Sequence, residues 1–238
     1  MTIHETARAA LAAMFGIWLL QMMGCATPQE VAQTSLVDLH KLTVSAERAD
    51  DEAFAKDIGF DSLEEVAEAQ LASPLRLYTV PLDKLAKFQP CDDPNKLLED
   101  TGSLIFPLTV KGQYRSSLIV KEKLLPNTID WMSPIKTLKA MGARHTGTGF
   151  RRVMPKIGKL KPTSSSFLVS IAPLRLFLLG DRKAERLVLT AIQENRHYEL
   201  NAEDERDATK LFGKIAPDAK RVYESDQKIR QLSPGGLP

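Results

Sequence analysis

Two histidines and a run of serines are the residues of this 238-residue sequence whose types fit hydrolytic chemistry. A serine becomes a nucleophile when a histidine takes its proton and an acidic group orients that histidine. Ser164, Ser165 and Ser166 follow a stretch that contains His145, and His197 lies further along the chain. No GxSxG motif surrounds these serines. We therefore assign no catalytic residue, and a hydrolase with His145 or His197 as its base is the alternative function.

Metal and nucleotide sites are not indicated by the remaining polar residues. Metal sites need clustered His, Cys, Asp or Glu, and His40, His145 and His197 are far apart. An acidic stretch does not follow the alternating pattern of a calcium-binding loop, and we interpret it as a solvated turn; its members are Asp92, Asp93, Glu99 and Asp100. The glycine-rich residues 142–149 lack the Lys-Ser/Thr pair of a P-loop. No metal and no cofactor is predicted.

Basic residues without acidic neighbours occupy the stretch between Trp131 and Gly180, which contains no Asp or Glu. The nine basic residues there are Lys136, Lys139, Arg144, Arg151, Arg152, Lys156, Lys159, Lys161 and Arg175. From Asp50 to Ser103, by contrast, 13 acidic residues outnumber five basic ones, so charge is separated along the chain. The first eight of the nine basic residues form the predicted contact with an anionic surface.

The separated charges leave three interpretations open. The acidic and basic segments dock on each other, each faces a partner, or the basic segment is a solvated loop whose charges only maintain solubility. An anionic lipid surface, a glycan or an envelope protein would suit the basic segment, because a basic residue near an anionic surface gains about 1 kcal/mol. The net charge of +2 and the scarcity of aromatic residues in this segment argue against nucleic acid.

The N-terminus carries an unbroken apolar run over residues 9–20, preceded by Arg8. The run is shorter than the roughly 20 residues of a membrane-spanning helix, but it fits the apolar region of a secretory signal. A small residue, Gly24, then precedes Cys25. This arrangement resembles the lipobox of bacterial lipoproteins. A secretory signal cleaved elsewhere and an N-terminal amphipathic helix are the alternatives.

The lipoprotein resemblance implies that the Cys25 thiol receives a diacylglycerol and that Cys25 becomes the first residue of the mature chain. It also implies a protein of the cell envelope, held on the membrane through Cys25. Ala26, in place of Asp, implies the outer membrane, facing the periplasm, if the organism has two membranes. Lipidation would leave Cys91 as the one remaining thiol, so no internal disulfide is expected.

Periodicity predicts the elements of the exported body. Helical spacing predicts one long helix over residues 31–55 and a short helix from Asp61 or Ser62 to residue 72. Strands are predicted at residues 75–80, 104–110, 113–120, 167–179 and 186–192, and 104–120 reads as a hairpin around Lys111-Gly112. Pro107 suggests an edge or a bulge in its strand, and Pro173 suggests a bend between the halves of one strand or an edge. Residues 129–131 suggest a short strand, and residues 134–141 suggest a short helix. A loop is predicted over residues 143–166 and a turn over residues 180–183. A last helix is predicted over residues 203–212, ending at Gly213.

These elements predict an α+β fold with an antiparallel, curved sheet of about five to seven strands, a long N-terminal helix and a C-terminal helix. The connections between neighbouring strand candidates are mostly too short for parallel crossovers. The architecture resembles cystatin-like domains, without a shared motif. We expect a signal peptide at residues 1–24, a tether at 25–30, one domain at 31–230 and a flexible tail at 231–238. The function indicated is a binding or structural module of the cell envelope; the alternative is an envelope hydrolase.

Overall fold

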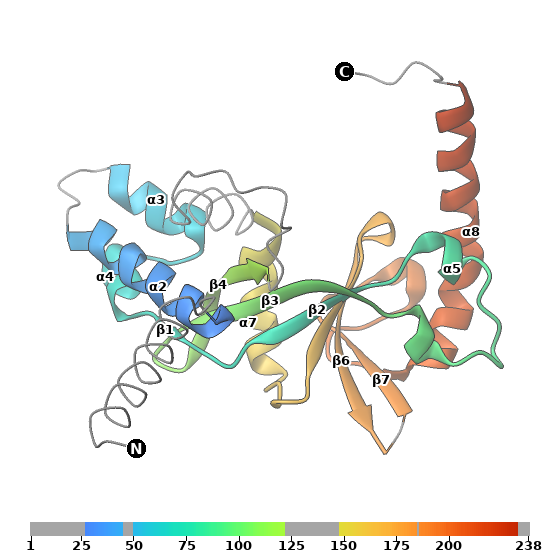
Figure 1. Cartoon of the computed structure of the whole chain (residues 1–238), viewed down its shortest axis with the longest axis horizontal. Coiled ribbons are helices and arrows are strands. Elements are labelled where there is room, and N and C mark those ends of the chain that lie inside the picture. Colours follow the sequence, from blue (N-terminus) through green and yellow to red (C-terminus); the bar gives the residue numbers. More distant parts are fainter. Residues whose placement is uncertain (1–26, 45–49, 122–147, 185, 233–238) are drawn as a thin grey trace, which may run out of the picture.

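The computed structural model describes residues 27–44, 50–121, 148–184 and 186–232, which form one sheet and the helices packed on it (Figure 1). The strands are β1 (Gln70–Leu71), β2 (Leu75–Thr79), β3 (Glu99–Val110), β4 (Gln113–Lys121), β5 (Phe167–Ile171), β6 (Leu176–Lys183), β7 (Arg186–Ala191) and β8 (Glu205–Asp207). The α-helices are α2 (Pro28–Val44), α3 (Asp50–Ile58), α4 (Leu63–Glu68), α5 (Leu82–Leu85), α7 (Thr148–Lys159) and α8 (Ala208–Leu232). Short 3-10 helices are η1 (Pro94–Leu97), η2 (Ala172–Leu174) and η3 (Arg196–Tyr198). The α+β class is confirmed.

The sheet has eight strands in the order β1-β3-β2-β5-β6-β7-β8, and β4 pairs with β3. It is mixed, because β2 and β5 run parallel while the other pairs run antiparallel. The prediction of a wholly antiparallel sheet is wrong at this one pair. The chain leaves β2, forms β3 and β4, and passes through α7 before β5 returns beside β2. Two parallel neighbouring strands need such a long crossover. The sequence prediction considered only the short connections between consecutive strands, so it missed the pairing of β2 with β5.

Helix α7 covers one face of the sheet. Its Val153, Met154 and Ile157 pack with side chains of β2, β3, β5 and β6. The opposite face is covered by two groups of helices at its two ends. Helices α2, α3 and α4 lie over β3 and β4, and α5 and α8 lie over β5, β6 and β7 (Figure 1). Alternating residues of each strand point to opposite faces, and this alternation separates Ile105 on the α7 face from Phe106 on the other.

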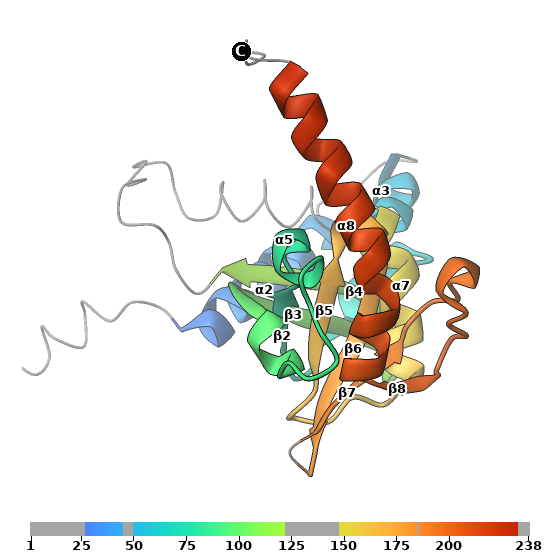
Figure 2. The same ribbon diagram turned by 90° about the vertical axis from the view of Figure 1, so that its right-hand side faces the viewer.

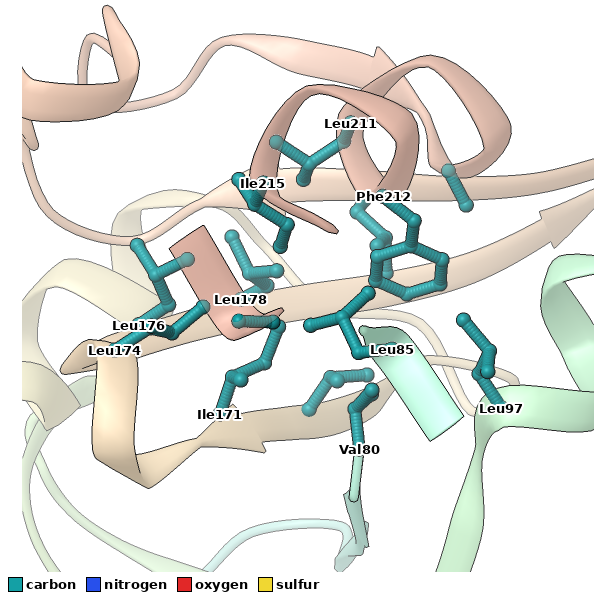
Figure 3. Close-up of a cluster of buried hydrophobic side chains, with 14 of the residues drawn as sticks. Val80, Leu85, Leu97, Ile171, Leu174, Leu176, Leu178, Leu211, Phe212 and Ile215 are labelled. Carbon is teal, nitrogen blue, oxygen red and sulfur yellow. The ribbon is translucent and has the colours of Figure 1, made fainter. Parts of the chain in front are cut away.

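The largest buried cluster joins α5 and α8 to the sheet (Figure 3). Leu211, Phe212 and Ile215 of α8 point toward Leu178 of β6 and Leu85 of α5 (Figure 3). Phe88 and Phe212 meet edge to face with ring centroids 5.9 Å apart. This cluster anchors the first half of α8 to the sheet.

The N-terminal helix region differs from the single helix predicted over residues 31–55. The structure has α2 and α3 as separate helices, and residues 45–49 lie outside the described residues. Helix α2 also begins earlier, at Pro28. Thr27 and Glu30 form a reciprocal capping box, since the Thr27 N–H donates to Glu30 at 2.7 Å and the Glu30 N–H donates to the Thr27 hydroxyl at 3.2 Å. Residues 28–30 of the predicted tether are therefore helical.

Helix α7 lies where the sequence predicted a loop. Val153, Met154 and Ile157 are at most 2% exposed, and burying three such side chains contributes about 5 to 9 kcal/mol. Pro155 and Gly158 inside the helix together cost about 4 kcal/mol. Tertiary burial thus outweighs the helix-breaking residues that favoured a loop. The predicted elements at 129–131 and 134–141 lie outside the described residues.

Helix α8 starts later and continues much further than predicted. Residues 205–207 form β8, and the Asp207 carboxylate accepts the N–H groups of Thr209 and Lys210 at 3.0 and 3.2 Å. The helix then passes through Gly213 and Pro217 to Leu232. The predicted end at Gly213 is wrong because buried residues on both sides of it, from Ala208 to Ala219, hold the helix on the sheet.

The strand predictions at residues 167–192 are confirmed, with a shifted turn. Pro173 lies in η2, which joins the antiparallel strands β5 and β6. Residues 180–183 belong to β6 rather than to a turn. Asp181 stays in register with Val188, so the reversal comes after Lys183.

Pro107 sits inside the sheet, because β3 pairs on both sides. Its carbonyl accepts the Ala72 N–H at 2.9 Å, and in a strand the N and C=O of one residue point the same way. The missing N–H therefore faces the break between β1 and β2. The edge prediction is wrong, whereas the predicted bulge matches a register shift between Leu108 and Thr109.

The predicted β3–β4 hairpin is confirmed. Val110 pairs with Gln113, and the two turn residues, Lys111 and Gly112, have φ angles of 50° and 77°. Two consecutive positive φ angles characterise the tight type I′ turn that suits the twist of paired strands. Gly112 occupies the second of these positions, where a side chain is strained.

We expect Gly112→Val to lower the free energy of unfolding by more than about 1 kcal/mol, because valine does not tolerate this conformation. Urea unfolding monitored by circular dichroism measures the change. Gly213→Ala is the matched control, since nothing lies within 4 Å of the added Cβ; alanine in a helix should raise stability by about 0.5 to 1 kcal/mol. An unchanged midpoint for Gly112→Val would contradict the strained turn.

Candidate functional site: the basic side of α7 and the α8 groove

The basic residues singled out in the sequence are only partly described. Cys25, Lys136, Lys139, Arg144 and His145 lie outside the described residues. Arg151 and Arg152 belong to α7, of which the structure describes only the backbone at these two positions. Lys156, Lys159 and Lys161 are exposed on α7 and just after it.

These three lysines form the basic side of α7. Val153, Met154 and Ile157 bury the other side of the helix against the sheet, so the lysines point to solvent. Among the described residues no carboxylate pairs with Lys156, Lys159 or Lys161. Their positive charge is therefore available to an external anion.

The acidic segment from Asp50 to Ser103 pairs with other cations. Lys84 binds Glu99 at 2.5 Å and Arg76 binds Asp100 at 2.7 Å. From the hairpin, Arg115 binds Glu65 at 2.8 Å and Asp61 at 3.3 Å, and Lys111 binds Glu68 at 3.4 Å. Among the described residues, no salt bridge joins this acidic segment to Lys156, Lys159 or Lys161. The acidic and basic stretches meet instead through the pairing of β2 with β5 and through apolar packing of β2 against α7.

The acidic turn has local structural roles. Asp93 caps η1 by accepting the Asn95 N–H at 2.9 Å, and it also accepts the Asn95 side-chain amide at 2.9 Å. The side-chain bond, and then the backbone bond, lower the pKa of Asp93. Asp92 accepts the Gln89 N–H at 2.7 Å. Among the described residues, no group of three or more His, Cys, Asp or Glu side chains could hold a metal ion. Cys91 in the same turn is an exposed free thiol.

A groove of about 660 Å³ runs along α8 on the side of the 3-10 helices η2 and η3. Its volume lies within the range of ligand-binding clefts. The residues that line it are Pro173, Leu174, Arg175, Asn195, His197, Tyr198, Asp218, Arg221, Val222, Ser225, Asp226 and Ile229. It therefore contains one of the two histidines considered for catalysis.

Asp218 is the centre of the polar contacts in the groove. The His197 Nε2–H and the Arg221 guanidinium both donate to its carboxylate. These two bonds, that of Arg221 first, lower the pKa of Asp218. His197 also packs edge to face on Tyr198, with ring centroids 4.6 Å apart. The polar floor of the groove is thus satisfied from within the chain.

The groove does not bring a serine hydroxyl into a hydrogen bond with His197, as an activated nucleophile would require. Ser225 lines it, but the Ser225 hydroxyl donates to the Arg221 carbonyl at 2.8 Å. Ser166 lies elsewhere and donates to Asp181 at 2.7 Å, while Thr163 and Ser165 bind each other at 2.9 Å. In the described part of the chain no serine hydroxyl bonds to a histidine. His40 instead contacts the Ala69 carbonyl through Nε2 at 3.1 Å, which ties α2 to the end of α4.

Sequence reasoning missed the groove residues on α8. Asp218, Arg221 and Ser225 follow Gly213 and Pro217, where a helix was expected to have ended. A usable signal was present, because Ile215, Val222 and Ile229 recur at seven-residue spacing across Pro217. That spacing indicates one continuous apolar side of a helix.

Comparison of the chain with models of protein families, with curated proteins and with solved structures gave no match. The site is therefore interpreted from its own chemistry.

Among the described residues, none of the helices combines the length and the apolar character needed to cross a membrane.

Tyr198 gives the groove a testable pH dependence. Burial, and then the charge of Asp218, raise the pKa of Tyr198 from 10 to about 12. Between these values the unfolded chain loses the tyrosine proton and the folded chain keeps it, so stability falls as pH rises. The measurement is urea unfolding at a series of alkaline pH values. Over this pH range, the free energy of unfolding of the parent should fall by up to about 1.4 kcal/mol per pH unit more than that of Tyr198→Phe. Parallel losses in both proteins would contradict the raised pKa.

Proposed function

We propose that the chain is a lipid-anchored cell-envelope protein, a binding module that contacts an anionic surface through the basic side of α7. In an organism with two membranes it is held on the outer membrane and faces the periplasm. The observation that carries the proposal is that Lys156, Lys159 and Lys161 are exposed without carboxylate partners in the described part of the chain.

The packing of α7 supports an electrostatic contact rather than insertion into lipid. An amphipathic helix that inserts into a bilayer needs a free apolar side. The apolar side of α7 is occupied, because Met154 and Ile157 are fully buried against the sheet. The exposed side of α7 therefore offers its charge for binding an anionic surface. Three lysines near such a surface contribute about 3 kcal/mol to the free energy of binding.

The position of the predicted anchor is compatible with this contact. Two residues lie between Cys25 and Pro28, where α2 begins, and the three extended Cα–Cα steps from Cys25 to Pro28 span about 10 Å. The start of α2 would thus stay close to the membrane. Helices α2 and α7 both contact β4. They do so from opposite faces of the sheet, so the start of α2 and helix α7 flank the same edge strand.

Hydrolysis is the less supported function. A general base must reach the proton that it removes, directly or through one water. The only hydrogen bond of His197 to a side chain in the described residues goes to Asp218. The charged side of α7 is the better-supported functional feature.

The chain without residues 1–25 should cosediment with anionic phosphatidylglycerol vesicles at low salt, and not with neutral phosphatidylcholine vesicles. Replacing Lys156, Lys159 and Lys161 together by Gln should weaken this binding by roughly a hundredfold. Moderate salt should weaken the parent's binding as well, because screening acts beyond about 10 Å at 0.1 M. An anionic polysaccharide in place of the vesicles distinguishes a glycan from lipid.

The matched control replaces Lys210, Lys220 and Lys228 by Gln, which removes the same charge from exposed positions on α8, a helix that packs on the opposite face of the sheet from α7. This variant should bind vesicles like the parent. Equal weakening by both triple variants would indicate attraction by net charge alone, and a parent that ignores anionic vesicles at low salt would refute the contact.

Acylation of Cys25 is tested separately. In cells of a lipoprotein-processing bacterium, the mature chain should begin at Cys25, carry acyl chains by intact-mass measurement and partition into the detergent phase. Cys25→Ser should abolish the acylation, whereas Cys91→Ser should leave it intact. An unmodified Cys25 in the parent would refute the lipid anchor.

A further inference from the structure

A smaller cavity, of about 260 Å³, lies where β2, β5 and β6 meet the turn that precedes β5. Arg76 and Tyr78 of β2 and Arg182 of β6 line it, together with Ser164 and Ser165 of the turn. Among the described residues, no Asp or Glu belongs to its lining. The cavity therefore combines positive charge with hydroxyl groups, and this combination suits an anion.

The register of the strands brings the two arginines to one face of the sheet. Arg76 of β2 and Gly180 of β6 both align with Phe167 of β5, and residues two positions apart on a strand share a face. Arg182 therefore points to the same face as Arg76. The end of β6 extends past the start of β5 (Figures 1 and 2), which places Arg182 beside the turn that contains Ser164.

Arg182 is held by contacts that leave its two terminal nitrogens unused. Its guanidinium lies 5.1 Å from the Phe167 ring centroid, and its Nε–H donates to the Asn95 side chain at 3.5 Å. In the described part of the chain no carboxylate pairs with Arg182. Arg76 donates to Asp100 at 2.7 Å, so that carboxylate offsets the charge of Arg76. Arg182 thus supplies the net positive charge of the cavity.

Two hydroxyl groups add to the donors around Arg182. Ser164 is exposed, and its hydroxyl forms no hydrogen bond with another described residue. Tyr78 packs its ring edge to face on Phe167 with centroids 5.0 Å apart, and its hydroxyl has no hydrogen-bond partner within the same residues either. Ser165 already shares a bond with Thr163 at 2.9 Å.

We propose that this cavity binds a phosphoryl group, carried by a small molecule or by a lipid headgroup. A guanidinium donates two parallel N–H groups to the oxygens of a phosphate, and the terminal nitrogens of Arg182 are the donors for this contact. A tetrahedral phosphate directs its remaining oxygens away from that pair, and the Ser164 hydroxyl donates to one of them. The site is separate from the basic side of α7, because Lys156, Lys159 and Lys161 do not line the cavity.

Isothermal titration calorimetry of the full chain in a non-ionic detergent tests the site, with glycerol phosphate as the probe. The parent should bind it, and Arg182→Gln should weaken the binding at least tenfold, because a charge-assisted contact is lost. Arg182→Lys should weaken it as well, since an ammonium group lacks the paired donors. Ser164→Asp should also weaken it at least tenfold by placing negative charge at the cavity.

Thermal unfolding checks that each variant is folded. Ser164→Asp should melt like the parent, because this exposed side chain has no hydrogen bond to lose. It therefore tests the site even if loss of the Phe167 contact unfolds Arg182→Gln. Arg186→Gln is the matched control, because Arg186 is an exposed arginine of the neighbouring strand β7 that does not line the cavity. It should bind glycerol phosphate like the parent.

Inorganic phosphate and a short-chain phosphatidic acid distinguish the two sources of the phosphoryl group. Binding of inorganic phosphate as tight as that of phosphatidic acid supports a free phosphate, and tighter binding of phosphatidic acid supports a headgroup. The triple Gln variant of Lys156, Lys159 and Lys161 should bind all three probes like the parent, which separates this site from the contact proposed for α7. A parent that binds none of the probes would overturn the proposal. Binding unchanged in Arg182→Gln and Ser164→Asp, or weakened equally by Arg186→Gln, would also overturn it.

Discussion

The parallel pairing of β2 with β5 joins the two halves of the molecule. Four residues of β2, from Arg76 to Thr79, align with Phe167 to Ser170 of β5, and the Val80 N–H extends the ladder to the Ser170 carbonyl at 3.2 Å. On one side of this pair lie β3, β4 and the helices α2 to α4. On the other side lie β6, β7 and α8. The position of the groove relative to the hairpin depends on this pairing.

Phe167 shows how tightly the junction is packed. Its ring meets Tyr78 edge to face with centroids 5.0 Å apart, and the Arg182 guanidinium lies 5.1 Å from its centroid. Gly180 of β6 lies directly beneath, where an added Cβ would come within 2.4 Å of the ring. Because the two strands must approach around an aromatic ring, this position requires a residue without a side chain.

Two helices of the protein use amphipathicity in opposite ways. Helix α7 packs Val153, Met154 and Ile157 against the sheet and leaves Lys156 and Lys159 exposed. Helix α8 buries only the first half of its apolar side, so Val222 and Ile229 stay exposed. One surface is therefore suited to an interaction that salt screens, and the other to an interaction driven by apolar burial.

The sequence by itself determined the elements whose signals are local. Alternating residues and the Lys111-Gly112 turn located the hairpin, Ser62 capped α4 by accepting the Glu65 N–H at 3.4 Å, and the α+β class followed from the run of strands and terminal helices. Only the tertiary structure decided the fate of α7 and α8. Pro155 and Pro217 oppose a helix locally, and burial of Ile157 and Ile215 against the sheet overrides that preference. The β2–β5 pairing and the meeting of His197 with Asp218 were equally beyond local signals, because both join residues that come together only when the crossover through α7 and the docking of α8 are complete.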